Sequence, residues 1–288
     1  MEKLMLKPNE VIDDVLLVYE AKANYPKLKS IILGFLSGAF IALGAYASTL
    51  ASNGISNPSL AKLISGAIFP IGLILVVLCG TDLFTGNILL TVPLLERKIT
   101  FKQVFVNLTI IYFSNFLGAF TISSMIYFSG SLDFNNFALG GYALKLAYTK
   151  GSMGFIPALL SGTLCNILVC LAVWCSYGAK DIMSKIATVW IIIMTFIVSG
   201  FEHSVANMYY LTIGLLAKGN ENYINAINLP AEKLDYIDIP HMFNNLIPVT
   251  LGNIIGGAVF VSLSFWLLYR YIPRSKNKNK LGNMKHSA

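Results

Sequence analysis

The sequence has few charged residues. Only 12% of its 288 residues are Asp, Glu, Lys or Arg, whereas 56% are hydrophobic and the mean hydropathy is +0.67. Because an average soluble domain is about 25% charged, this composition excludes an ordinary soluble fold. Apolar runs of about 20 residues, long enough to cross a hydrocarbon core of about 30 Å, recur along nearly the whole chain. We therefore expect a protein embedded in the lipid bilayer, with no room for a second, soluble domain.

Residues suited to catalysis or metal binding are also scarce. The chain has four cysteines, all inside apolar runs, where we expect small buried thiols rather than a disulfide or metal framework: Cys79, Cys165, Cys170 and Cys175. No apolar run carries paired histidines, and neither a Gly-rich phosphate loop nor a serine nucleophile elbow is present. The sequence predicts no enzyme activity, no cofactor and no metal site.

Six apolar stretches predict an all-α integral membrane protein with six transmembrane helices. They are residues 30–51, 64–95, 104–129, 156–177, 186–216 and 245–272. An even number of spans places both termini on one side of the membrane. The chain divides into an N-terminal segment (1–29), a six-span channel domain (30–272) and a basic tail (273–288).

The N-terminal segment has five lysines, five acids and no apolar core, so it is not a cleaved signal peptide. Five of its apolar residues share one helical face: Val11, Ile12, Val15, Leu16 and Tyr19. They predict a helix that either lies at the membrane surface or packs on the membrane domain.

The distribution of lysine and arginine predicts the orientation. Sixteen of the 21 fall on the side of the termini, and five fall on the other side: Lys62, Lys145, Lys150, Lys218 and Lys233. The positive-inside rule then places both termini in the cytoplasm. The net charge of +7 thus reflects topology, and no nucleic-acid partner is expected because no aromatic platform or binding motif accompanies the basic tail.

The two halves of the chain resemble each other at three places. Residues 36–38 match 160–162, Asn115 and Gly118 match Asn253 and Gly256, and 80–87 match 200–207. Both members of the last pair read Gly, any residue, an acid, four residues, Asn. Three spans per repeat is an odd number, so the second half must be inverted in the membrane relative to the first.

The paired segments 80–87 and 200–207 interrupt spans of 32 and 31 residues. A straight helix of that length would reach about 47 Å, too far for a core of about 30 Å, so both spans are predicted to be broken. Irregular backbone at membrane depth is tolerated only where it is buried in protein or lines a cavity. The two breaks therefore predict the transport site.

Asp82 and Glu202 are the only acids in the predicted spans, and His203 is the only histidine there. An ionisable group at this depth costs several kcal/mol, which indicates a function. Alternatively, the two acids only hold the loops by accepting hydrogen bonds from freed backbone N–H groups. His203 lies in the break and has no counterpart in the first repeat, which favours a role in the pore over a structural one.

Residues 77–86 and 162–172 resemble the two signature segments of the formate/nitrite transporter family, and residues 200–208 resemble its third marker. Within the family, the sequence is most similar to the clostridial hydrosulfide channel. The resemblance covers about the whole chain. It implies a homopentamer of aquaporin-like protomers, each with its own pore, in the bacterial cytoplasmic membrane.

The resemblance also implies site residues. The polar pathway residues would be Asp82, Thr85, Lys150, Asn166, Glu202, His203 and Asn207, with Lys150 in the outer vestibule. The apolar constrictions would be formed by Phe69, Leu73, Leu83, Phe84, Phe196 and Phe201. Without the resemblance, the Phe and Leu residues read as packing, Lys150 as a solvated loop charge, Thr85 as a helix cap and Asn166 as a link between helices.

We expect a channel or transporter for small monovalent weak-acid anions, namely hydrosulfide, formate or nitrite, that cross with protonation near His203. The alternative is a channel for water or small neutral solutes. It would carry Asn-Pro-Ala at both breaks, which this chain lacks. A membrane-embedded enzyme is less favoured, because no catalytic motif is present.

Overall fold

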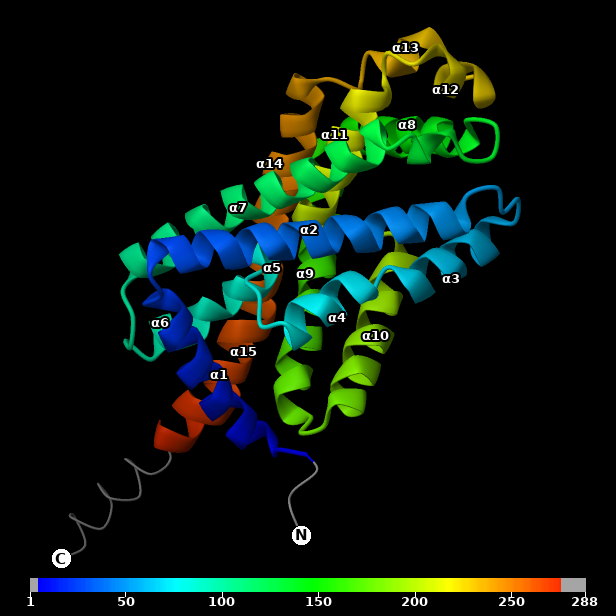
Figure 1. Cartoon of the computed structure of the whole chain (residues 1–288). Helices are drawn as coiled ribbons and strands as arrows, with labels where there is room; N and C mark the ends of the chain where they lie inside the picture. The colour runs from blue at the N-terminus through cyan, green and yellow to red at the C-terminus, as the bar shows by residue number, and fades with distance from the viewer. Residues whose placement is uncertain (1–4, 276–288) are drawn as a thin grey trace, which may run out of the picture.

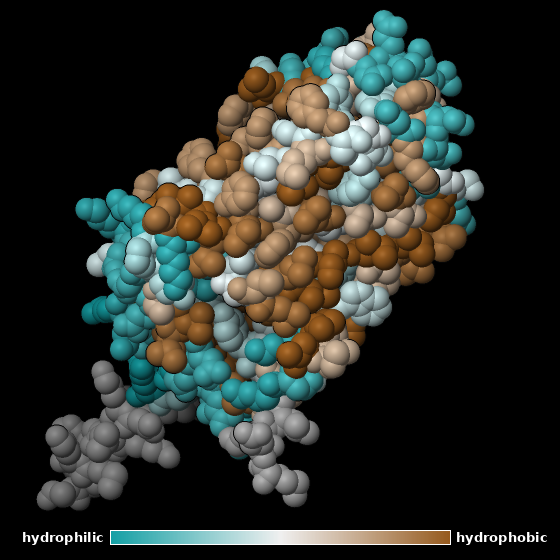
Figure 2. Space-filling view, viewed as in Figure 1, coloured by the Kyte–Doolittle hydropathy of each residue, from teal (hydrophilic) through white to brown (hydrophobic). Residues whose placement is uncertain are grey.

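The computed structural model describes residues 5–275, and its regular elements in this range are all helices. Six of them are long and apolar enough to cross a membrane: Lys27–Ser52, Pro58–Leu78, Phe101–Phe128, Phe155–Gly178, Ile182–Ser199 and Ile239–Ser275. Figure 2 shows apolar side chains across the middle of one face and hydrophilic ones toward its two ends. The six-span, all-α prediction is confirmed, although the second span begins at Pro58 rather than at residue 64.

The helices form two repeats of three spans. The first comprises α2 (Lys27–Ser52), the broken span α3 (Pro58–Ile68), α4 (Ile71–Leu78), α5 (Phe84–Asn87), η1 (Ile88–Leu90) and α6 (Thr91–Leu95), and α7 (Phe101–Phe128). The second comprises α9 (Phe155–Gly178), the broken span α10 (Ile182–Ser199) and α11 (Ser204–Ala217), and a last span made of α14 (Ile239–Ile255), η3 (Gly256–Leu263), α15 (Ser264–Trp266) and η4 (Leu267–Tyr271). Between the repeats lie η2 (Ser131–Asp133) and α8 (Ala138–Gly151), and α12 (Glu221–Ala226) and α13 (Ala231–Leu234) precede α14.

The first and third spans of each repeat cross in close contact. A Cβ on Gly38 would lie 2.0 Å from the carbonyl oxygen of Asn115, and one on Gly256 would lie 2.2 Å from that of Thr163. Such distances are impossible for a real Cβ, so only glycine permits these helices to approach so closely. Close crossing is thus the physical reason for the outer sequence matches between the repeats.

Both predicted breaks are present. Helix α4 ends before Gly80, whose φ is +65°, and α10 ends at Gly200, whose φ is +72°. This left-handed conformation suits glycine because it has no Cβ. A short extended segment follows each glycine, and the second half-helix then begins at Phe84 or Ser204.

Helix α1 (Pro8–Ala23) packs on the membrane domain, which was one of the two arrangements predicted for this segment. Val11, Ile12, Val15 and Tyr19 are buried there. In Figure 1, α1 and the last described helices lie at one end of the molecule and α8, α12 and α13 at the other. We name these ends the α1 side and the α8 side.

The four cysteines are all free thiols, as expected, but only two are buried. Cys165 and Cys170 lie in the core of the protomer, whereas Cys79 and Cys175 are exposed on its surface. The expectation of four buried thiols was therefore wrong for these two. Position within an apolar run does not tell whether a side chain faces protein or lipid.

Candidate functional site

Two asparagines, one from each repeat, hold the broken spans together. Asn115 Oδ1 accepts a hydrogen bond from the backbone N–H of Phe84 at 2.9 Å, and Asn253 Oδ1 accepts one from Ser204 N–H at 2.9 Å. Each amide nitrogen donates to two carbonyls, which are those of Gly34 and Asp82 for Asn115 and those of Gly162 and Glu202 for Asn253. Both asparagines are fully buried. They satisfy the first free N–H of each second half-helix, a function that the sequence reading did not assign to them.

The two breaks meet at His203 and Thr85. His203 Nε2 lies 2.7 Å from Thr85 Oγ1, and the ring nitrogen Nδ1 accepts a hydrogen bond from Ala206 N–H at 3.1 Å. Because the Nδ1 lone pair is occupied, the neutral ring carries its proton on Nε2 and donates it to Thr85 Oγ1. The Thr85 hydroxyl keeps its own proton for another acceptor. Thr85 does not cap the half-helix, because Asn115 does.

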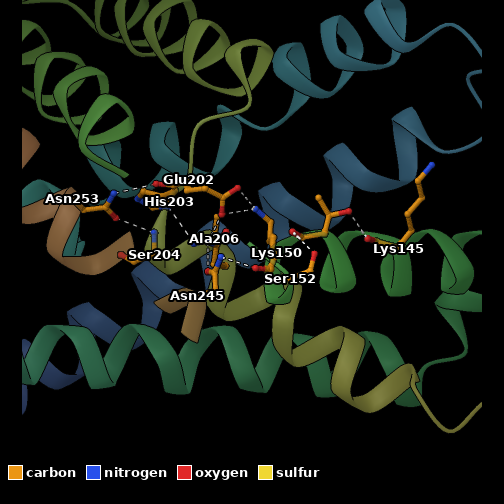
Figure 3. Close-up of polar contacts among 11 residues, drawn as sticks. Lys145, Lys150, Ser152, Glu202, His203, Ser204, Ala206, Asn245 and Asn253 are labelled. Carbon is orange, nitrogen blue, oxygen red and sulfur yellow. Dashed lines mark hydrogen bonds and ion pairs between the residues drawn. The ribbon is translucent and has the colours of Figure 1, made fainter. Parts of the chain in front are cut away.

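Glu202 is the centre of a polar network on the α8 side (Figure 3). Its carboxylate accepts two hydrogen bonds from Lys150 Nζ, at 2.9 and 3.1 Å, and one from Asn207 Nδ2 at 2.6 Å. Asn207 also donates to Asn245, whose own amide donates to the Lys150 carbonyl. Lys150 lies on helix α8 and is half-buried, so the solvated loop charge is wrong for this residue.

Asp82 has an equivalent partner on the α1 side that the sequence reading missed. Lys22 Nζ lies 2.7 Å from Asp82 Oδ1, so an ion pair with this ammonium group holds the fully buried carboxylate. Burial by itself lowers the pKa of Lys22, but the Asp82 carboxylate raises it, and the net pKa lies above its usual value. The acid of each repeat, Asp82 or Glu202, thus pairs with a lysine and not with the freed backbone N–H groups.

The position of Lys22 carried a signal. Lys22 is the second residue from the end of α1, and Lys150 is the second from the end of α8. Both helices directly precede the first span of their repeat. The equivalent position of a lysine in these two helices is therefore the sequence signal that identifies Lys22.

Four of the six predicted constriction residues meet in one place. Phe69, Leu73, Leu83 and Phe196 line a cavity of only about 10 Å³ together with His203. The rings of Phe69 and Phe196 meet edge to face, with centroids 5.6 Å apart. We name the four apolar residues Phe69, Leu73, Leu83 and Phe196 the slit. Phe201 and Phe84 do not line this cavity, and Phe84 packs against Tyr112 instead.

A wider cavity opens on the α1 side of the breaks. It has a volume of about 270 Å³, and its lining includes Tyr19, Lys22, Thr81, Tyr177 and Lys185. Tyr19 donates a hydrogen bond from its hydroxyl to the carbonyl of Gly86 at 3.0 Å. Helix α1 therefore forms part of the wall of this cavity.

Asn166 and Cys170 both contact the backbone at Thr85. Asn166 Nδ2 donates to the carbonyls of Thr85 and Asn253, and Cys170 Sγ donates to the Thr85 carbonyl at 3.3 Å. Asn166 thus links three helices, while its buried Oδ1 has no partner among the described residues. Within the described residues, no three His, Cys, Asp or Glu side chains lie close enough to hold a metal ion.

Inverted repeats, two paired breaks and buried acid–lysine pairs on either side of an apolar slit together define a membrane transport protein. The profile of the formate/nitrite transporter family matches residues 9–267, and the chain belongs to this family. Its relatives are channels and transporters, not enzymes.

The formate channel FocA of Escherichia coli (strain K12) is 35% identical over 253 residues, which cover 86% of this chain and 89% of FocA. A solved pentameric formate channel with formate bound is 33% identical, with a TM-score of 0.79, and the match covers 84% of this chain and 97% of that one. The aquaglyceroporin of Plasmodium falciparum matches 83% of this chain and 98% of its own at 16% identity and a TM-score of 0.50. This last likeness shows an aquaporin-like fold alone.

Proposed function

We propose that the chain is a channel for small monovalent anions of weak acids. Formate is the first candidate because several relatives that the chain matches are formate channels. Nitrite and hydrosulfide are further candidates on chemical grounds, and the resemblance to the clostridial hydrosulfide channel favours the latter. The observation that carries the proposal is the slit, which lies beside the His203–Thr85 pair and between two acid–lysine pairs.

The apolar slit favours the passage of a neutral solute over that of a charged one. Moving a bare monovalent ion into a low-dielectric medium costs on the order of 20 kcal/mol in the idealised limit. Protonating a carboxylate whose pKa is near 4 costs only about 4 kcal/mol at pH 7. The anion therefore crosses the slit wholly or mainly as its neutral conjugate acid.

His203 acts in this mechanism as a neutral hydrogen-bond donor. Protonating Nδ1 would require the loss of its hydrogen bond from Ala206 N–H, so in this arrangement the imidazole does not become a cation. The Thr85 hydroxyl, polarised by His203 Nε2–H, donates to the passing solute. The proton that the anion gains near this pair comes from water outside the slit.

Lys150 and Lys22 attract the anion to the two ends of the path. Each ammonium is neutralised in part by its acid, so the attraction is local and does not trap the ion. The positive-inside distribution of lysine and arginine supports placing the α1 side in the cytoplasm and the α8 side outside. We further propose a homopentamer in the bacterial cytoplasmic membrane, because a matched relative is pentameric.

Flux measurements on proteoliposomes test this proposal. The purified chain should conduct formate, nitrite and hydrosulfide above empty vesicles, and osmotic water flux should stay near that of the bare lipid. High water permeability with no anion flux would instead identify the aquaporin-type alternative.

A further inference from the structure

A second polar cavity lies on the α8 side, apart from the candidate pore. It has a volume of about 490 Å³ and is formed by α8, the loop after α2, and residues 227–233. Five polar residues that line it matter here: Asn53, Tyr142, Lys145, Tyr148 and Lys233. Neither Lys150 nor Glu202 lines this cavity. We name it the outer cavity.

The outer cavity presents hydrogen-bond donors and positive charge without a compensating acid. No Asp or Glu lines it. Among the described residues, neither Lys145 nor Lys233 forms an ion pair, and Lys233 Nζ lies 5.1 Å from the centroid of the Tyr148 ring.

Two ammonium groups and the two phenol hydroxyls of Tyr142 and Tyr148 are donors of the kind that bind an oxyanion. The volume is many times the roughly 10–15 Å³ that one water needs, so it exceeds the needs of a single small ion.

We propose that the outer cavity binds an oxyanion group, a phosphate or a carboxylate, that belongs to a ligand larger than the conducted anions. Lys145 and Lys233 supply the charge, and the hydroxyls of Tyr142 and Tyr148 supply neutral donors. The ligand is either a free organic anion or the headgroup of an anionic lipid. This site is independent of the proposed conduction pathway, because it shares no lining residue with the slit.

The test uses the full chain in nanodiscs of zwitterionic lipid, with inorganic phosphate as the probe. Thermal unfolding is followed as phosphate is titrated, since a ligand that binds only the folded state raises the midpoint. We expect saturable stabilisation of the parent. The Lys145→Gln/Lys233→Gln double variant should bind phosphate at least about tenfold more weakly, as expected when charge-assisted contacts are lost. Lys62→Gln, an exposed lysine on the same side that does not line the cavity, is the matched control and should behave like the parent.

Stabilisation that is absent in the parent, or equal in parent and double variant, would overturn the proposal. If the double variant does not assemble, each single lysine variant is titrated with the same criteria. A second arm repeats the parent titration in nanodiscs that contain phosphatidylglycerol. Loss of the phosphate response there identifies a lipid headgroup as the occupant, and an unchanged response identifies a free anion.

Discussion

The slit should pass a weak acid and reject an anion that cannot be protonated. Each pH unit above the pKa of the acid costs about 1.4 kcal/mol, a factor of ten in the protonated fraction. Formate flux should therefore rise about tenfold for each unit by which external pH falls toward that pKa, until another step limits it. Chloride can reach the same ends of the path but cannot gain a proton, so its flux should stay low at every pH.

Leu73→Ala tests whether the slit itself imposes this rule. The cavity of about 10 Å³ beside Leu73 does not exceed the roughly 10–15 Å³ needed for one water. Leu→Ala substitutions in packed cores leave cavities of up to about 100 Å³, in which chloride could keep part of its hydration shell. Chloride flux should increase in Leu73→Ala, whereas formate flux should change less. Phe196→Ala should act in the same direction, since its ring lines the same cavity and packs against Phe69.

The assay is anion flux across proteoliposome membranes by stopped flow, over a series of external pH values. Both slit variants lose buried apolar contacts worth about 2–5 kcal/mol, so their assembly must be checked by size exclusion. Leu132→Ala, at a residue equally buried but outside the slit, controls for destabilisation alone. Equal chloride and formate permeability in the parent, with no dependence on pH, would refute neutral-acid passage.

Four further predictions concern single side chains. His203→Phe should leave assembly intact while abolishing or strongly altering anion flux and its pH dependence, and unchanged flux at every pH would remove this residue from the mechanism. Lys150→Glu should lower anion conductance at low salt through repulsion between like charges, and the effect should fade as salt shortens the Debye length to about 10 Å at 0.1 M. Lys22→Met leaves the buried Asp82 carboxylate without its ion pair and should cost about 3–5 kcal/mol in unfolding free energy, whereas an added Asp82→Asn should restore much of it. Because the folded-state pKa of Lys22 is raised above its usual 10.5, the parent should keep this contribution below pH 10.5 and lose it as pH rises further, and thermal unfolding of Lys22→Met should lack that alkaline loss. Asn253→Leu should lower thermal stability by leaving a buried backbone N–H unpaired, and a melting curve like that of the parent would contradict the capping role.

Much of the architecture followed from the sequence because lipid restricts what a chain can do. A bilayer forces apolar runs into helices of a set length, so span number and the excess length of spans two and five could be read directly. The repeated pattern of Gly, acid and Asn located both breaks, and in the structure one glycine of positive φ, Gly80 or Gly200, lies in each.

Tertiary structure alone decided how these parts contact one another. Thr85 and His203 meet although 118 residues separate them, and Asn253 caps a half-helix 49 residues away. Hydropathy tells that a residue is in the membrane but not which neighbour it faces, so Phe196 and Phe84 look alike in sequence and only the first lines the slit. Likewise, in the sequence Lys22 is only one of the five lysines of a polar N-terminal segment. It becomes the partner of a fully buried acid only because α1 folds back against the first broken span, where an unpaired carboxylate would be too costly to keep.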